Sequence, residues 1–287
     1  MCRIFGFRSV IQSQVHRSLV TANNALAVQS EAHRDGWGVA YYVADAPHLI
    51  KGTSPAVEDK IFNRVSGVVA SETVLAHLRL ATAGEVNILN AHPFQYGRWV
   101  FAHNGKIVDW PAYRASLMQH VAPNLQGFVL GDTDSEVIFY VFLSALARRV
   151  DLHRRGTALS DVHEALSETV ALVRGLCDGD DDDSRSLLTI VVTDGNSMVG
   201  IGGGKPLRYS TYKTACLDRE TCPFLSHACE APTTDGHVNH LIISSEALQG
   251  ENVWHDLADG EVIGVDWRMV LHQGRLGSPL TKAGLAK

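Results

Sequence analysis

The sequence predicts an α+β fold in which two mainly antiparallel β-sheets carry helices on their outer faces. Short segments with β-strand character open the chain, long helical segments cluster near its middle, and short strand-like segments return afterwards. Consecutive short strands favour antiparallel pairing, and clustered helices favour covering layers. The sequence pattern alone leaves the order of the layers open.

The first hundred residues are expected to form strands interrupted by one helix. Apolar residues at helical spacing predict a helix over residues 10–28. Gly36 and Gly38 indicate a turn before the next strand. The expected strands, all short and apolar, are Cys2–Phe7, Val39–Val43, Thr73–Thr82 and Trp99–Ala102.

Three helices are predicted in the middle of the chain. Asp109–Val121 has Asp109 as its expected N-cap and a proline in its first turn. Asp134–Arg149 begins with acidic residues and ends with arginines, as the helix dipole favours. Ser160–Cys177 is expected to be capped by Ser160.

The second half returns to strands, after an acidic run at Asp178–Asp183 that is interpreted as a solvated loop. The expected strands are Leu187–Val192, Met198–Ile201, Leu207–Ser210, Leu241–Ser244, Val262–Val265 and Arg268–Leu271. Residues 1–287 are interpreted as a single domain, with an inserted loop containing cysteine and histidine around residues 211–239.

Composition excludes several classes of protein. The apolar content of 45% and charged content of 20% are those of an ordinary globular protein. The net charge of -6 and the lack of a basic stripe argue against a nucleic-acid partner. No apolar run of about 18 residues predicts a membrane span, and no signal peptide is recognisable at the start. A cytoplasmic protein is therefore expected.

Cys2 stands apart from the other cysteines because of its position. Removal of Met1, which small second residues favour, leaves a thiol and a free α-amine on one residue. The α-amine has a pKa of about 7.7–8.0, so it can accept the thiol proton near neutral pH. The alternative is a small buried side chain in the first strand.

Five ordered segments carry a resemblance to a known family. They are Met1–Arg3, His33–Gly38, His77–Thr82, Ala91–Phe94 with His103–Gly105, and Gly131–Glu136. Together they resemble the class II glutamine amidotransferases of the Ntn-hydrolase superfamily. The Asp35–Gly38 segment, Asp-Gly-Trp-Gly, is most similar to a standalone branch that includes γ-glutamyl hydrolases. The resemblance implies a four-layer αββα sandwich.

The resemblance also implies a binding site for a glutamine-like substrate. Arg79 fits the α-carboxylate, because a guanidinium group matches it in a planar, bidentate way; a surface salt bridge is the alternative. Thr82 can add a hydroxyl contact. Asp134 fits the α-ammonium group, with a helix N-cap as the alternative, and Asp132 is the expected cap if only one of them serves.

Further residues of the motifs are assigned to catalysis and its support. Asn104 and Gly105 fit an oxyanion hole, with an Asn-Gly turn as the alternative. Asp35 and Gly36 are expected to form a tight turn beside the nucleophile, with a plain hairpin as the alternative. His92 either lines the substrate pocket or has a structural role.

A cluster of three cysteines and one histidine is a weak candidate for a metal site. Cys216, Cys222, His227 and Cys229 lie within fourteen residues and offer four zinc ligands. Their spacing lacks a Cys-x-x-Cys knuckle, so a loop without metal is preferred.

The sequence thus predicts a cysteine amidohydrolase that cleaves the γ-amide of glutamine or of a γ-glutamyl compound. Cys2 forms a γ-glutamyl thioester, and water releases glutamate without any cofactor. The expected partner is a small-molecule substrate, with neither nucleic acid nor membrane; a homo-oligomer stays open. One alternative is a glutaminase subunit that gives ammonia to a separate partner synthase. Another is a non-catalytic glutamine sensor or interaction protein.

Overall fold

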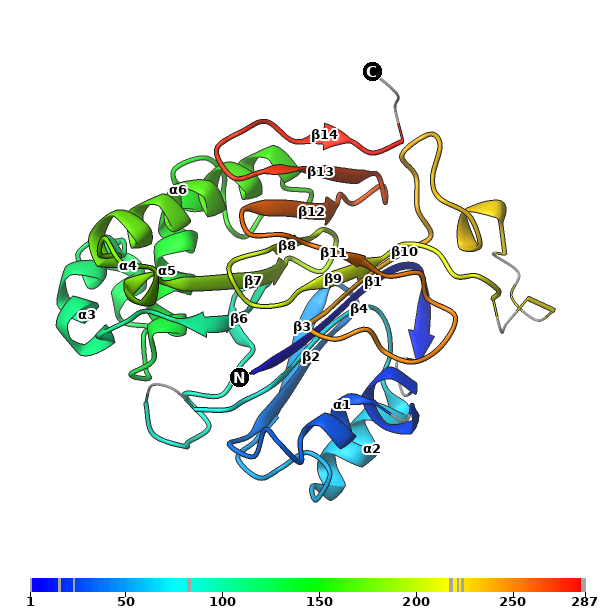
Figure 1. Ribbon diagram of the computed structural model, residues 1–287, viewed down its shortest axis with the longest axis horizontal. Helices are drawn as coiled ribbons and strands as arrows, with labels where there is room; N and C mark the ends of the chain where they lie inside the picture. The colour runs from blue at the N-terminus through cyan, green and yellow to red at the C-terminus, as the bar shows by residue number, and fades with distance from the viewer. Residues whose placement is uncertain are drawn as a thin grey trace.

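Two antiparallel sheets of seven strands dominate the computed structural model (Figure 1). The structure describes residues 2–14, 17–22, 24–81, 84–216, 219–220, 222 and 225–284. The order of strands in sheet A is β11-β9-β10-β1-β4-β2-β3, and in sheet B it is β14-β13-β12-β8-β7-β6-β5. The prediction of two antiparallel sheets is confirmed.

Sheet A brings together strands from both ends of the chain. Its strands are β1 (Arg3–Gln14), β2 (Trp37–Val43), β3 (Ala46–Gly52), β4 (Ala70–Leu78), β9 (Arg208–Ser210), β10 (His240–Ser244) and β11 (His255–Asp256). The first strand, β1, lies between β4 and β10. The beginning of the chain is therefore held in the interior of a sheet.

Sheet B is built mostly from the second half of the chain. Its strands are β5 (Phe94–Tyr96), β6 (Trp99–Lys106), β7 (Leu187–Thr193), β8 (Met198–Ile201), β12 (Glu261–Val265), β13 (Leu271–Arg275) and β14 (Thr281–Lys282). The helices are α1 (Leu26–Gln29), α2 (Lys60–Val68), α3 (Trp110–Met118), α4 (Pro123–Gln126), α5 (Asp134–Ala147) and α6 (Leu159–Cys177).

Three hydrophobic clusters define the order of the layers. Side chains alternate between the faces of a strand, so Ile4 of β1 packs between the sheets whereas Phe5 packs on the outer face of sheet A. The outer cluster of sheet A includes Leu26 of α1 and Phe62 of α2. The third cluster joins sheet B to the remaining helices. The four layers are thus α, β, β and α, as the resemblance implied.

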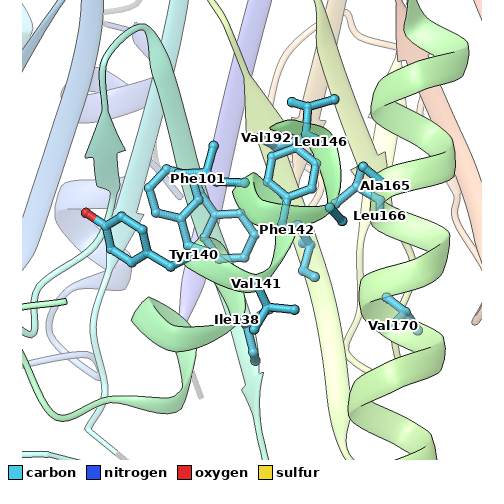
Figure 2. Packing of buried hydrophobic residues seen from close by; sticks show 14 of the residues in the cluster. Phe101, Ile138, Tyr140, Val141, Phe142, Leu146, Ala165, Leu166, Val170 and Val192 are labelled. Carbon is cyan, nitrogen blue, oxygen red and sulfur yellow. The ribbon is translucent and has the colours of Figure 1, made fainter. Parts of the chain in front are cut away.

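Helix α5 is the central element of the layer over sheet B. Figure 2 shows Phe142 of α5 beside Val192 of β7, with Leu166 and Val170 of α6 on the neighbouring helix. The residues Asp134–Leu146 are all buried. The predicted helix Asp134–Arg149 is confirmed apart from its last two residues. Its first residues therefore hold a fixed position next to sheet B.

The predicted helix over residues 10–28 is wrong in its first part. Strand β1 continues to Gln14, because Ser13 and Gln14 pair with the start of β4 beyond an irregularity in the register. Among the described residues of this range, helical structure is limited to a π-helix at Arg17–Thr21 and to α1. Hydrogen bonding to a neighbouring strand has overridden the helical spacing of the apolar residues.

Two boundaries near turns were also predicted wrongly. Gly38 belongs to β2 rather than to a turn, and a Cβ atom there would collide with the carbonyl oxygen of His92. The strand expected at Arg268–Leu271 begins only at Leu271, because Met269 lies in a turn with a φ of 59°.

One of the two expected caps lies at the predicted position and the other does not. The N-cap of α6 is Ala158, so Ser160 lies inside the helix. Asp109 does occupy the N-cap position of α3, but its side chain makes no capping hydrogen bond. Helix α2 and strand β3 were not predicted at all.

The segment 211–239 connects β9 to β10 and contains a short 3₁₀ helix, His227–Cys229. Isolated bridges join it to the main body at Lys213–Asn252 and at His237–Val270. Among the residues that the structure describes, no helix has the length and apolarity needed to cross a bilayer.

Candidate active site

Cys2 lies immediately before β1 and is half-buried. The register of β1 on β4 pairs Arg3 with Leu78, which places Cys2 beside the segment that follows β4. The thiol donates to the Leu80 carbonyl oxygen, and the Leu80 N–H group faces the sulfur, both at 3.4 Å. The start of the chain is thereby held at a defined position.

The surroundings of Cys2 favour its protonated form. Burial raises the pKa of the Cys2 thiol above its ordinary value, and the nearby Asp134 carboxylate adds to this rise. The backbone hydrogen bond to Leu80 and the Arg79 charge lower the pKa, but they do not reverse the shift. A base must therefore take the thiol proton before the sulfur can act as a nucleophile.

Arg79 is a buried cation directly after β4, at 3% exposure. That burial is incompatible with the alternative of a surface salt bridge. The sequence placed Arg79 within a strand running to Thr82, but β4 ends at Leu78. One guanidinium nitrogen, Nη2, donates to the Gly84 carbonyl oxygen at 3.2 Å. The side chain is thus fixed in the loop beside Cys2.

Acidic groups surround this guanidinium. Burial lowers the pKa of Arg79, and the nearby groups of Cys2, Asp35, Asp132 and Asp134 raise it. Removing a cation from water is costly unless anions and hydrogen bonds compensate. The site therefore concentrates opposite charges around one buried guanidinium group.

Asp35 and Gly36 hold the Arg79 segment in place. The Asp35 N–H group donates to the Arg79 carbonyl oxygen at 3.1 Å, and the Arg79 N–H group donates to the Gly36 carbonyl oxygen at 2.8 Å. The Asp35 carboxylate accepts from the Ala81 N–H group at 2.7 Å. Gly36 has a φ of 119°, and a Cβ atom there would lie 2.6 Å from the Gly52 carbonyl oxygen. Only glycine fits this turn without strain.

Asn104 and Gly105 lie within β6, where they pair with Thr189 and Leu188 of β7. The alternative of an Asn-Gly turn is therefore wrong. A Cβ atom on Gly105 would collide with the Leu187 carbonyl oxygen. Asn104 is buried and lines a cavity of 220 Å³ together with Arg3, the residue after Cys2. A residue of sheet B, Asn104, thus lines one cavity with Arg3 of sheet A, which directly follows Cys2 in the chain.

Asp134 is the first residue of α5, but it does not cap the helix. The cap is Thr133, whose hydroxyl accepts from the Glu136 N–H group at 3.3 Å, so the expectation for Asp132 is wrong as well. The Asp134 carboxylate accepts from the Ile107 N–H group at 2.8 Å. This bond ties the start of α5 to the residue after β6.

Three buried histidines form contacts between sheet A and sheet B. The rings of His77 on β4 and His92 stack with centroids 4.2 Å apart. The Nε2 atom of His77 lies 3.3 Å from the carbonyl oxygen of His103 on β6. Burial lowers the pKa of His77 to about 3 and lowers those of His92 and His103. All three rings are thus neutral near pH 7.

Sequence reasoning overlooked the roles of His77 and His103. The Nδ1 atom of His103 lies 2.8 Å from the Ser135 hydroxyl, next to Asp134. Both histidines belong to the recognised motif segments, and that membership could have indicated a structural role next to the site. Thr82 lies outside the described residues.

The structure brings only some of the candidate metal ligands together. Cys216, Cys222 and Cys229 line one cavity of 110 Å³ together with His240, whereas His227 is exposed and does not line it. These cysteines are free thiols. Within the described part of the chain, no group of three or more His, Cys, Asp or Glu residues is arranged to hold a metal ion.

Comparison with known proteins agrees with this arrangement. The family model described as "Glutamine amidotransferases class-II" matches residues 1–279. The probable glutamine amidotransferase DUG3 of Saccharomyces cerevisiae is 32% identical over 238 residues, covering 75% of this chain and 65% of the relative. The gamma-glutamyl-hercynylcysteine sulfoxide hydrolase of Mycobacterium tuberculosis is 33% identical over 119 residues, covering 38% of this chain and 50% of the relative. The chain therefore spans less than two thirds of each relative.

Solved structures establish the fold independently. A glutamine aminotransferase class-II domain protein from Silicibacter pomeroyi matches with a TM-score of 0.64 at 21% identity, covering 96% of this chain and 98% of that one. The glutamine phosphoribosylpyrophosphate amidotransferase of B. subtilis matches with a TM-score of 0.60 at 13% identity, covering 97% and 50%. The four layers are those of an Ntn-hydrolase fold. With its five motif segments inside the matched range, this chain belongs to the class II glutamine amidotransferases.

Proposed function

We propose that this protein hydrolyses the γ-amide bond of glutamine or of a γ-glutamyl compound, with Cys2 as its nucleophile. The observation that carries the proposal is the position of the Cys2 sulfur, 3.4 Å from the Leu80 backbone and next to the buried Arg79. A relative whose name describes a γ-glutamyl hydrolase supports the same bond type.

The reaction begins once Met1 is removed. The free α-amine of Cys2 accepts the thiol proton, and the thiolate attacks the γ-carbonyl carbon. The carbonyl π electrons move to oxygen, where the Asn104 amide and the Gly105 N–H group donate hydrogen bonds to the oxyanion. When the carbonyl reforms, the C–N bond breaks and the ammonium group gives its proton to the departing amine. A γ-glutamyl thioester remains.

Water completes the cycle through the same groups. The α-amine takes a proton from the attacking water, the oxyanion forms again at Asn104 and Gly105, and the C–S bond breaks. Glutamate leaves, and the sulfur recovers its proton. The raised pKa of the thiol explains why such a base has to be close by.

Arg79 and Asp134 select the glutamyl part of the substrate. The guanidinium group of Arg79 pairs with the α-carboxylate, and the Asp134 carboxylate pairs with the α-ammonium group. Both side chains are buried, so these ion pairs are shielded from water. His92, whose ring is buried against His77, is proposed to contribute to the shape of this site. The substrate contact expected of Thr82 stays a prediction, because that residue lies outside the described part of the chain. No cofactor takes part in any step.

Intact-mass analysis after treatment with the glutamine analogue diazo-oxo-norleucine tests the proposal. We expect the mature chain to lack Met1 and to carry one label, which disappears together with activity in Cys2→Ala. The matched control is Cys177→Ala, a buried cysteine at the end of α6, which keeps the label. Full activity of a chain that retains Met1, or labelling that persists in Cys2→Ala, contradicts the mechanism.

A further inference from the structure

The cavity that Arg3 and Asn104 line holds no part of the glutamyl group in the mechanism proposed above. It has a volume of 220 Å³ and is lined by Arg3, Asn104, Pro206, Arg208, Ser245 and Glu246. We refer to these six residues as the outer pocket. Asn104, the proposed oxyanion donor, forms part of its wall, so the outer pocket borders the reacting carbonyl.

The order of strands in sheet A places this pocket on the opposite side of Cys2 from Arg79. Strand β1 has β4 on one side, and Arg79 follows β4. On its other side lie β10 and then β9 (Figure 1). Ser245 directly follows β10, and Arg208 is the first residue of β9; both line the outer pocket. The Ser245 N–H group donates to the Ile4 carbonyl oxygen at 3.0 Å, which fixes this wall against β1.

This arrangement distinguishes the two halves of a γ-glutamyl substrate. If Arg79 holds the glutamyl group on the β4 side, the group attached to the scissile nitrogen extends toward β10 and β9. A water molecule in the liquid takes up about 30 Å³, and ammonia is of similar size. The outer pocket is therefore several times larger than release of ammonia from glutamine requires.

The charges of the outer pocket favour an anionic group. Its lining carries two arginines and one glutamate. Arg3 pairs with Glu246 and also donates to the Cys2 carbonyl oxygen at 3.3 Å. Within the described residues, the buried Nε atom of Arg3 has no hydrogen-bond partner. Each guanidinium group offers five N–H donors, so both arginines can donate hydrogen bonds to a further carboxylate.

Arg208 is the better placed of the two for this task. Its Nε atom pairs with Asp256 at 2.6 Å, and Asp256 lies outside the pocket lining with 80% of its side chain exposed. The ion pair orients Arg208 from the solvent side, while the rest of the guanidinium group remains available to the pocket.

We propose that the outer pocket binds the leaving group, and that this group is an amino acid or short peptide whose free carboxylate pairs with Arg208 and Arg3. The inference rests on the proposed γ-glutamyl hydrolase function and specifies its substrate class. Under this proposal, the enzyme hydrolyses γ-glutamyl peptides in preference to glutamine.

Three substrates test the proposal on the unmodified protein. These are glutamine, γ-glutamyl-alanine, and γ-glutamyl-alaninamide, in which the carboxylate of the leaving group is neutralised. We expect the highest kcat/KM for γ-glutamyl-alanine, with a loss of about tenfold for the alaninamide, as is typical when a charged hydrogen-bonded pair is removed. Equal kcat/KM values for these two dipeptides would overturn the carboxylate assignment.

Arg208→Gln tests the residue itself. The ratio of kcat/KM for γ-glutamyl-alanine to that for the alaninamide is expected to fall about tenfold, through KM. A ratio taken on one sample is independent of the fraction of protein that folds. The matched control is Arg275→Gln, an exposed arginine that pairs with Glu261 on sheet B, which keeps the wild-type ratio. An unchanged ratio in Arg208→Gln refutes the pocket assignment.

The two proposals fail in different ways. Hydrolysis of glutamine with no discrimination among dipeptides leaves the proposed function intact and removes the leaving-group pocket. Absence of glutamate release from all three substrates removes the proposed function itself.

Discussion

At the scale of single residues, the candidate site depends on close approaches that only certain side chains allow. Gly36 and Gly105 sit where a Cβ atom would meet a backbone oxygen. Arg79 is buried among acidic groups, and Asn104 borders the outer pocket. These positions are set by contact with distant segments, so the fold itself restricts which side chains they can carry.

Asn104→Ala is the sharpest test of a single residue in the catalytic mechanism. Loss of one oxyanion donor typically lowers kcat by about 10²- to 10³-fold, and we expect that loss here with little change in KM. The measurement is steady-state glutamate release. Asn63→Ala, an exposed asparagine on α2, serves as the control. A kcat within a factor of three of wild type would remove Asn104 from the oxyanion hole.

At the scale of elements, the site is assembled where several of them begin or end. Cys2 precedes β1, Arg79 follows β4, and Asp134 begins α5. The hydrogen bond from the Ile107 N–H group to Asp134 ties α5 to the end of β6. The start of α5 therefore controls both the stability of the helix and the position of a proposed binding group.

The observed cap of α5 can be tested by comparing it with a serine near the start of α6 that was expected to be a cap. Thr133→Ala removes the observed N-cap of α5 and is expected to lower the free energy of unfolding by about 1 kcal/mol. Ser160→Ala changes a residue inside α6 that caps nothing, so its effect is expected to stay within about 0.5 kcal/mol. Urea denaturation of both variants measures the difference, and equal effects would contradict the cap assignment.

At the scale of the whole molecule, a layer of neutral histidines joins the two sheets. His77 on β4 contacts the backbone of His103 on β6 and stacks on His92. Burial lowers the pKa of His77 to about 3, from 6.5 in the unfolded chain. Between these two values the unfolded state binds a proton that the folded state does not bind.

Acid should therefore weaken the association of the sheets. Stability rises with pH wherever the unfolded state holds more protons, so the contribution of His77 is complete above about pH 6.5 and is lost progressively as the pH falls toward 3. In His77→Gln, the slope of unfolding free energy against pH is expected to decrease by up to about one proton in this window. Urea denaturation at a series of pH values measures the slope, and an unchanged slope would show that His77 is not buried in its neutral form.

The sequence by itself determined the family, the antiparallel sheets, helix α5 and the motif segments that contain the site. These features depend on local patterns: apolar alternation, an acidic helix start, and short runs of specific residues. The register of a strand and the end of a helix depend on partners far along the chain, so the helix expected at residues 10–28 became mostly the continuation of β1.

Only the tertiary structure decided how the site is put together. It ruled out the alternative of an Asn-Gly turn by placing Asn104 and Gly105 in β6, gave the cap of α5 to Thr133, and brought Arg208 into one cavity with Arg3 and Asn104. The physical reason is the pairing of β1 with both β4 and β10. Segments more than 200 residues apart, such as Arg3 and Glu246, meet because antiparallel hydrogen bonding aligns them, and no local pattern in the sequence encodes that alignment.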